Sequence, residues 1–189
     1  IGDEAFDAGI QLYFDRCDGT AATLEDFVAC FAEASGKDLS HFMHWYNQAG
    51  TPRVVARGQY DAASKTYTLN LTQSTPPTPG QPDKRALPIP LTVGFVAQSG
   101  VQLASHLGGG ENSVSLREHL IVLDKPSASF VFDHVEAAPT PAFLRGFCAP
   151  VMLDDGLGSE DRLIQMSHDP DAFTRWEAGQ RLLREAIFA

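Results

Sequence analysis

Two histidines that lie three residues apart, His41 and His44, come nearest to a metal site in this sequence. A helical zinc pair is normally spaced at i and i+4, and an intervening glutamate acts as the general base. Here the spacing is i and i+3, and the residues between the histidines are Phe42 and Met43. Zinc also needs a third ligand, and nothing near the pair suggests one. We therefore interpret Phe42 and Met43 as core residues and place one or both histidines on a helix surface.

The other residues able to bind a metal or a phosphate are scattered or lie beside turn signals. The remaining histidines are far apart, and four aspartates are typical turn residues: His106, His119, His134 and His168; Asp124, Asp133, Asp154 and Asp155. The pair Asp154-Asp155 lacks the spaced Asp/Asn loop of a calcium site. Gly108-Gly109-Gly110 lacks the Gly-Lys-Ser/Thr ending of a phosphate loop, so we expect a turn between strands.

The sequence also shows no recognisable nucleophile for catalysis. No serine or cysteine has an evident base partner, and there is no G-x-S-x-G motif. Asn70-Leu71-Thr72 matches a glycosylation motif, but it lies within an expected strand and we attribute it to chance. The P-x-x-P spacing of residues 76–79 fits a polyproline ligand or a stiff loop, and its place between two strands favours the loop. We predict no catalytic, cofactor-binding or metal-binding residue in this chain.

Helical spacing marks the first fifty residues. Apolar residues fall on one helical face in each of three stretches: Phe6, Ile10, Tyr13 and Phe14; Phe27, Val28, Phe31 and Ala34; Leu39, Phe42, Met43 and Tyr46. Thr23-x-x-Asp26 resembles a capping box, and Gly36 ends the second helix. Asp38 is placed to cap the third helix, which Gly50 and Pro52 would end.

From about residue 53 the hydrophobic period becomes two. Residues 65–72 and 89–95 alternate cleanly, and shorter runs occur at 54–56, 114–123 and 130–132. Proline and glycine clusters separate these runs, a pattern typical of an antiparallel β-sandwich. Helical signals return after residue 153: Ser159 precedes two acidic residues, and Asp169-Pro170 is a second cap. Behind it lies an apolar stripe made by Phe173, Trp176, Leu183 and Ile187.

The predicted fold class is therefore multi-domain α and β, an antiparallel immunoglobulin-like β-sandwich flanked by N-terminal and C-terminal α-helices. The expected parts are 1–52 (helical), 53–153 (sandwich) and 154–189 (helical). The chain starts with Ile1 close to a helical pattern, and it ends in LLREAIFA without a glycine stop. Both ends are those expected of a piece of a longer protein.

Composition is that of an ordinary soluble globular protein, with 43% hydrophobic and 20% charged residues in 189. The net charge of −10 disfavours nucleic acid and anionic membranes as partners. No secretory signal or membrane-length apolar run is visible. Cys17, Cys30 and Cys148 form no C-x-x-C pair, which indicates reduced thiols and a cytoplasmic protein; a Cys17–Cys30 disulfide is the alternative.

Several stretches resemble a known family. DGTAATLEDF (18–27) and ASGKDLSHFMHWYNQAGTP (34–52) are similar to the end of the catalytic domain in zinc metalloaminopeptidases of the aminopeptidase N type. YTLNLTQSTPPTPGQPDKRALPIPL (67–91) resembles the β-domain that follows in bacterial members. SFVFDHV (129–135) and PAFLRGFCAPVML (141–153) resemble the end of that domain. The resemblance covers essentially the whole chain.

The resemblance implies a four-domain parent enzyme that removes N-terminal residues from peptides with a zinc-bound water. Residues 1–52 would be the tail of its catalytic domain, 53–153 its sandwich, and 154–189 the first helices of its C-terminal domain. The family's H-E-x-x-H and G-A-M-E-N motifs are absent from this sequence. We therefore expect zinc in the parent but none bound by this segment, which would be inactive alone.

Three hypotheses remain open from the sequence. The first is a structural inter-domain segment of an aminopeptidase, whose partners are the neighbouring domains of the parent chain and, for the parent, peptide substrates. The second is a free-standing β-sandwich that binds another protein, and the third is a small hydrolase with an unrecognised site. We also expect self-association of the isolated chain, because terminal helices would expose apolar residues: Phe6, Phe14, Trp176 and Phe188.

Overall fold

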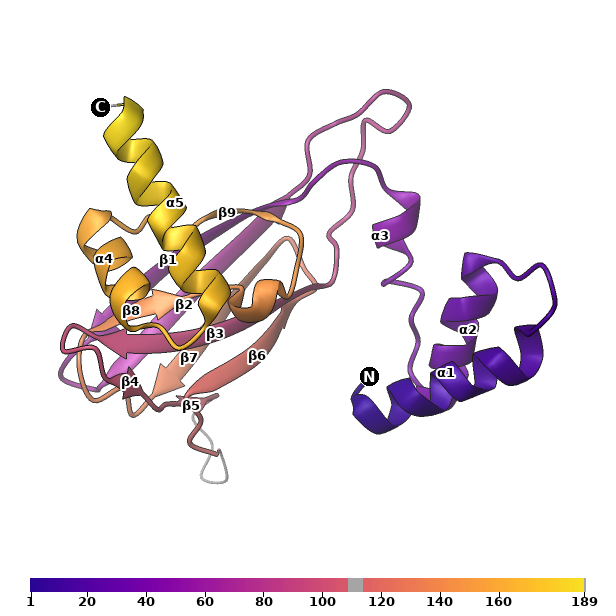
Figure 1. The fold of residues 1–189 in the computed structure, drawn as a ribbon, viewed down its shortest axis with the longest axis horizontal. Helices are drawn as coiled ribbons and strands as arrows, with labels where there is room; N and C mark the ends of the chain where they lie inside the picture. The colour runs from indigo at the N-terminus through magenta and orange to yellow at the C-terminus, as the bar shows by residue number, and fades with distance from the viewer. Residues whose placement is uncertain (109–113, 189) are drawn as a thin grey trace. The chain divides into compact units, whose positions relative to one another are not determined.

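The computed structural model describes residues 1–108 and 114–188, and the chain divides into two compact units, Ile1–Gln48 and Ala49–Ala189. The smaller unit is helical, and the larger one contains a two-sheet sandwich followed by helices (Figure 1). Within the described ranges, no helix combines the length and apolar character that crossing a membrane requires.

Two helices, α1 (Asp3–Cys17) and α2 (Leu24–Ser35), form the smaller unit through aromatic packing. The Phe31 ring lies 5.2 Å from that of Phe6 and 4.6 Å from that of Phe27, measured between centroids. The predicted capping box is confirmed: the Thr23 N–H donates to the Asp26 carboxylate (2.9 Å), and the Asp26 N–H donates to Thr23 Oγ1 (3.2 Å). Both helices were expected from the apolar spacing.

The third predicted helix is wrong in length. Only His44–Asn47 (α3) is helical, and turns precede it. Asp38 Oδ1 accepts the Ser40 N–H (2.8 Å), as an N-cap side chain does, and the Met43 N–H donates to the Leu39 carbonyl four residues back. The next three N–H groups donate to carbonyls only three residues back, as from His44 to His41. The stretch before α3 therefore forms turns, and His41 lies outside α3.

Five strands form the first sheet of the sandwich, in the order β5-β7-β2-β1-β9. Their bounds are β1 Arg53–Asp61, β2 Thr66–Ser74, β5 His106–Leu107, β7 Ser127–Asp133 and β9 Met152–Asp154. Neighbouring strands are antiparallel except β1 and β9, which run parallel with Arg53 opposite Met152. The short strands β5 and β9 carry too few residues for an alternation to be visible in the sequence.

The second sheet is centred on β3 (Ile89–Ala97), which pairs with β4 (Gln102–Leu103), β6 (Glu118–Leu123) and β8 (Pro139–Ala142). The inward residues of the two sheets face each other and are almost fully buried: Leu69, Leu71 and Phe132 from the first sheet, and Ile89, Leu91, Val93, Phe95 and Leu123 from the second. The predicted immunoglobulin-like sandwich is confirmed, although β6 begins at Glu118 rather than at residue 114.

Two helices, α4 (Ser159–His168) and α5 (Ala172–Phe188), follow the sandwich and lie against one side of it, next to β8 (Figure 1). The cap predicted for α5 is wrong by two residues. Asp171, not Asp169, accepts the Thr174 N–H (2.7 Å), while Asp169 ends α4 and is 2% exposed. Aspartate suits an N-cap at either position, but the Asp169 carboxylate is buried against Arg145, and Asp171 caps α5 instead.

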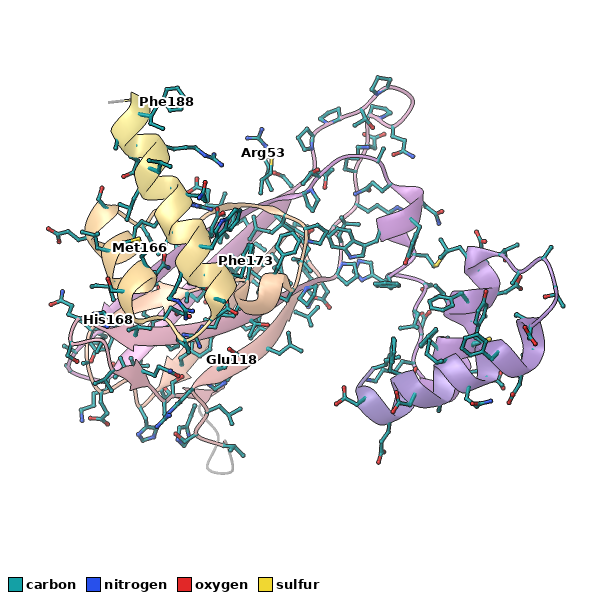
Figure 2. All side chains as sticks on the ribbon, in the orientation of Figure 1. Arg53, Glu118, Met166, His168, Phe173 and Phe188 are labelled. Carbon is teal, nitrogen blue, oxygen red and sulfur yellow. The ribbon has the colours of Figure 1, made fainter. Side chains whose placement is uncertain are left out.

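The face of α5 that meets the sandwich is also different from the predicted one. Thr174 and Ala178 are buried, whereas Trp176, Leu183 and Ile187 of the expected apolar stripe are more than half exposed. Figure 2 shows Phe173 at the sandwich end of α5 and Phe188 at the far end of the helix. The apolar stripe therefore covers no part of the sandwich beyond the first turn of α5.

Candidate functional site

The histidine pair does not gather metal ligands around it. His41 lies in a turn and His44 begins α3, with 5.4 Å between their ring centroids. Among the described residues, no three His, Cys, Asp or Glu side chains are grouped as a metal ion requires. Within residues 1–108 and 114–188, this pair does not fit the zinc that the resemblance implies for the parent, because two histidines alone cannot complete its tetrahedral shell.

The other four histidines pack against neighbouring side chains or backbone. His119 on β6 is 4% exposed and shares a hydrogen bond of 2.9 Å with the Ser105 hydroxyl. His106 and His134 stack at 4.8 Å between centroids, and His168 lies at the end of α4 next to Gly100.

The remaining motifs also have local roles. Residues 76–79 lie in the loop between β2 and β3, as predicted, and the Asn70 side chain is exposed on β2. Cys17, Cys30 and Cys148 are all free thiols. Of the three-glycine run, Gly108 precedes a gap, and Gly109 and Gly110 lie outside the described residues.

Buried charge is concentrated instead where the C-terminal helices meet the sandwich. The Arg145 side chain, on the 3₁₀ turn η1 (Arg145–Phe147), is 3% exposed and donates from one terminal nitrogen to Asp169 Oδ2 (2.8 Å). Its other terminal nitrogen lies 3.3 Å from the Arg117 carbonyl and 3.5 Å from Glu118. The Asp169 side chain is fully buried, so this ion pair joins the sandwich to the α4–α5 corner in the interior of the larger unit.

Gly94 on β3 makes room for this arginine. A Cβ atom at Gly94 would lie 1.9 Å from an Arg145 terminal nitrogen and 2.1 Å from its guanidinium carbon. No real contact is that short, so any larger residue would displace Arg145. The glycine is therefore required for close approach rather than for an unusual backbone angle.

A second buried ion pair lies between the end of β9 and α4. Asp155 accepts a short hydrogen bond from Arg162, and both side chains are 4–5% exposed. Arg181 on α5 lies 3.7 Å from the same carboxylate and donates to the Leu153 carbonyl (3.1 Å). Gln165 completes the set by donating to the Pro141 carbonyl of β8 (2.7 Å). We call Arg145, Asp155, Arg162, Gln165 and Asp169 the helix-docking network.

A pocket of about 340 Å³ borders this network. Asp155, Arg162 and Arg181 line it on the charged side. The aromatic side is formed by Phe147, Phe173 and Trp176, whose rings follow one another at 5.0 and 5.9 Å. Thr174 and Glu177 line it as well, and its carboxylates are paired with arginines: Asp155 with Arg162, and Glu177 with Arg181 (2.9 Å).

Sequence reasoning missed the helix-docking network. It assigned Asp155 and Asp169 to a turn and a cap, and it gave the arginines no role. A signal was present in PAFLRGFCAPVML, where Arg145 stands alone in an apolar run. A charged residue in such a run is either exposed or paired, and this one is paired.

Comparisons with known proteins agree with this architecture. The family model described as "Domain of unknown function (DUF3458) Ig-like fold" matches residues 50–156. The model described as "Domain of unknown function (DUF3458_C) ARM repeats" matches residues 159–189. The boundary between the two models falls at the segment that carries Asp155, where the sandwich gives way to α4.

Relatives of known name share the whole length of the chain. Aminopeptidase N of Escherichia coli K12 is 40% identical over 188 residues, which are 99% of this chain and 21% of that protein. Aminopeptidase N of Caulobacter vibrioides is 46% identical over 187 residues, 99% of this chain and 20% of that protein. The chain thus spans about a fifth of the length of these relatives.

A solved structure shows the same fold. The crystal structure of Legionella pneumophila aminopeptidase A in complex with aspartic acid superposes with a TM-score of 0.80 at 28% identity. The match covers 96% of this chain and 19% of that one. The chain belongs to the DUF3458 family of Ig-like domains, and 99% of it is similar to a segment that makes up about a fifth of aminopeptidase N.

Proposed function

We propose that this chain is the structural inter-domain segment of a zinc-dependent aminopeptidase, an enzyme that removes N-terminal amino acids from peptides. Similarity to aminopeptidase N over 99% of the chain carries the proposal. Residues 1–52 would be the helical tail of the catalytic domain, 53–153 the sandwich, and 154–189 the first helices of the C-terminal domain. The parent's zinc, its peptide substrates and its cytoplasmic location belong to the same proposal.

The helix-docking network explains how such a segment would work. A sandwich is rigid because two sheets share one core, so it can hold elements at a fixed spacing. Here Asp169 and Asp155 anchor the α4–α5 pair through Arg145 and Arg162, at sites with almost no exposure. Buried pairs of this kind favour one docking geometry over others, because a shifted helix would leave a charge unpaired.

The segment itself is proposed to be inactive. Its described residues hold no group of three metal ligands, and the sequence has no H-E-x-x-H motif. In the parent, zinc would activate the water that attacks the peptide bond, and residues of this chain would take no part in that step. Their contribution is to keep neighbouring parts of the protein in place.

A direct assay tests the proposal. The 189-residue chain is mixed with an aminoacyl chromogenic substrate, with and without added zinc, beside the complete protein from the same source. We expect metal-dependent hydrolysis by the complete protein and none by the chain. Zinc-dependent turnover by the chain alone would contradict its assignment as a non-catalytic segment. No activity in the complete protein would contradict the parent's assignment.

A further inference from the structure

The segment between β8 and β9 contains residues with an unfavourable backbone conformation. Leu144 and Phe147 have φ values of +58° and +53°, and Gly146 between them has a φ of +67°. This left-handed region costs free energy for residues with a Cβ atom, and it is rare for bulky ones such as leucine and phenylalanine. We call residues 144–147, which include η1, the latch. Two of its four residues are strained, so contacts with other elements must hold it in this form.

Two aspartates of the α4–α5 corner bind the latch. Arg145 donates to the buried Asp169 carboxylate (2.8 Å), and the Gly146 N–H donates to Asp171 Oδ1 (3.1 Å). Both aspartates belong to the three-residue connection 169–171 between the two helices. The latch therefore keeps these two hydrogen bonds only while the corner stays docked on the sandwich.

The end of the latch lies between α5 and β3. The Phe147 ring packs on the Phe173 ring of α5, with 5.0 Å between centroids. The next residue, Cys148, returns to β3: its Sγ accepts the Thr92 N–H (3.3 Å) and donates to the Pro90 carbonyl (3.4 Å). The latch thus connects the C-terminal helices to the second sheet.

Cys148 covers a free edge of β3. Gly94 pairs with both β6 and β8, so these two strands lie on opposite edges of β3. On the β6 edge the pairing continues through Pro90 and Thr92, whereas β8 pairs only with Gly94–Ala97. Among the residues that the structure describes, no strand pairs with Pro90 and Thr92 on the β8 edge. The thiol takes the place of a strand there.

We propose that the latch couples docking of the α4–α5 pair to the covering of this edge of β3. With the helices docked, the two aspartates hold the latch in its strained form and Cys148 lies on the edge. When the corner moves away, relief of the strain at Leu144 and Phe147 favours release, and the Thr92 N–H loses its acceptor. An uncovered edge is a template for pairing with another strand, so docked helices protect the sandwich from such pairing. The inference concerns the larger unit alone and does not depend on any enzyme activity.

Alkylation of Cys148 by iodoacetamide, measured by peptide mass spectrometry, tests the coupling. Asp169→Asn and Phe173→Ala each weaken one contact between the corner and the latch. Leu183→Ala shortens an exposed side chain elsewhere on α5 and is the control. We expect Cys148 to react about tenfold faster or more in Asp169→Asn, as loss of a charged hydrogen-bond partner implies. The increase should be smaller in Phe173→Ala and absent in Leu183→Ala, and Cys17 in the smaller unit should react at one rate throughout.

Amide hydrogen exchange of the same samples shows whether the edge opens by itself. Exchange at Thr92 should accelerate in Asp169→Asn and Phe173→Ala, while amides of β1 and β2 keep their protection. Unchanged Cys148 alkylation and Thr92 exchange in both variants would overturn the proposal. Loss of β1 and β2 protection together with that of Thr92 in both variants would also overturn it, because the edge would then open only with the whole sandwich.

A matched pair of substitutions at Phe147 tests the strain separately. Phe147→Gly and Phe147→Ala both remove the ring, but glycine adopts a φ of +53° freely and alanine does not. Cys148 should therefore be alkylated more slowly in Phe147→Gly than in Phe147→Ala. At an unstrained position the order would be reversed, because glycine gives the released chain more freedom. Equal or faster alkylation in Phe147→Gly would show that the latch stores no strain and would contradict the proposal.

Discussion

His119 is a buried titratable residue whose surroundings favour the uncharged imidazole. It lies between the sheets with 4% exposure, next to the Phe132 ring (5.3 Å between centroids) and the Ser105 hydroxyl. Burial lowers the pKa of His119 from its ordinary value, and His106 adds a smaller effect in the same direction. Hydrogen bonds with the Ser105 and Leu116 backbone act the other way and are outweighed.

This lowered pKa makes the sandwich less stable in acid. Below about pH 6.5 His119 becomes protonated in the unfolded chain but stays neutral in the folded chain until lower pH. The free energy of unfolding therefore falls as pH decreases. Above that pH neither state is protonated there, and the contribution is constant. Urea unfolding at several pH values between 8 and 5 should show a smaller loss of stability in His119→Gln than in the unmodified chain.

Measurements at pH 7.5–8 are the control for the comparison of His119→Gln with the unmodified chain. At pH 7.5–8 the stabilities of the two proteins should run parallel, because His119 is neutral in both folded and unfolded states. Equal slopes below pH 6.5 would mean that His119 does not disfavour protonation in the folded state.

At the level of residues, the sequence predicted environments only where a pattern repeats. The alternation at Leu69, Leu71, Leu91 and Val93 identified buried positions correctly. The partners of Arg145, Asp155 and Asp169 could not be predicted, because an isolated charge has no period and tertiary packing brings each pair together. The start of α5 was predicted wrongly for a similar reason. Both Asp169 and Asp171 have side chains that suit an N-cap, and only tertiary packing determines which of them caps the helix.

At the level of elements, the Arg145–Asp169 pair couples η1 to the corner between α4 and α5. Arg145→Met would leave the Asp169 carboxylate buried without its cation, which typically costs about 3–5 kcal/mol of unfolding free energy. We expect a loss of this size in urea unfolding followed by circular dichroism. Arg184→Met, with the same charge change at an exposed position on α5, should alter stability by about 0.5 kcal/mol or less.

A double variant separates the pair from general damage to the core. In Arg145→Met with Asp169→Asn the buried charge is gone, so the combined loss should be smaller than the sum of the two single losses. Additive losses would show that the two side chains stabilise the protein independently.

Element types were easier to predict than element lengths. Helices α1, α2 and α5 and the long strands were predicted from apolar spacing, and α4 from the acidic residues after Ser159. The Thr23 capping box marks the start of α2. The helix predicted before α3 is absent because the N–H groups from His44 to Tyr46 bond to carbonyls three residues back, as in turns, rather than four. The strands β4, β5 and β9 are two or three residues long, too short for any period to appear.

At the level of the whole molecule, large apolar side chains remain exposed near both ends. Phe6, Phe14, Trp176 and Phe188 are 50%, 57%, 58% and 84% exposed. Apolar surface of this kind favours association, so we expect dimers or larger species of the isolated chain. Light scattering should give a mass above 20.5 kDa, and Trp176→Ser with Phe188→Ser should lower it.

A matched change at a polar position tests whether apolar contact is responsible. Arg184→Ser shortens an exposed side chain of α5 without removing apolar rings, and it should leave the measured mass unchanged. A monomer mass for the unmodified chain across the concentration range would contradict the expected self-association.

The parallel pairing of β1 with β9 determines how the sandwich would respond to mechanical load. Force applied at the start of β1 and beyond the end of β9 pulls these neighbours lengthwise past each other. The hydrogen bonds between Arg53–Val55 and Met152–Asp154 are then sheared together, whereas an antiparallel pair pulled from its open end unzips one bond at a time. The first and last strands thus form a small shear-resistant joint where the chain enters and leaves the sandwich.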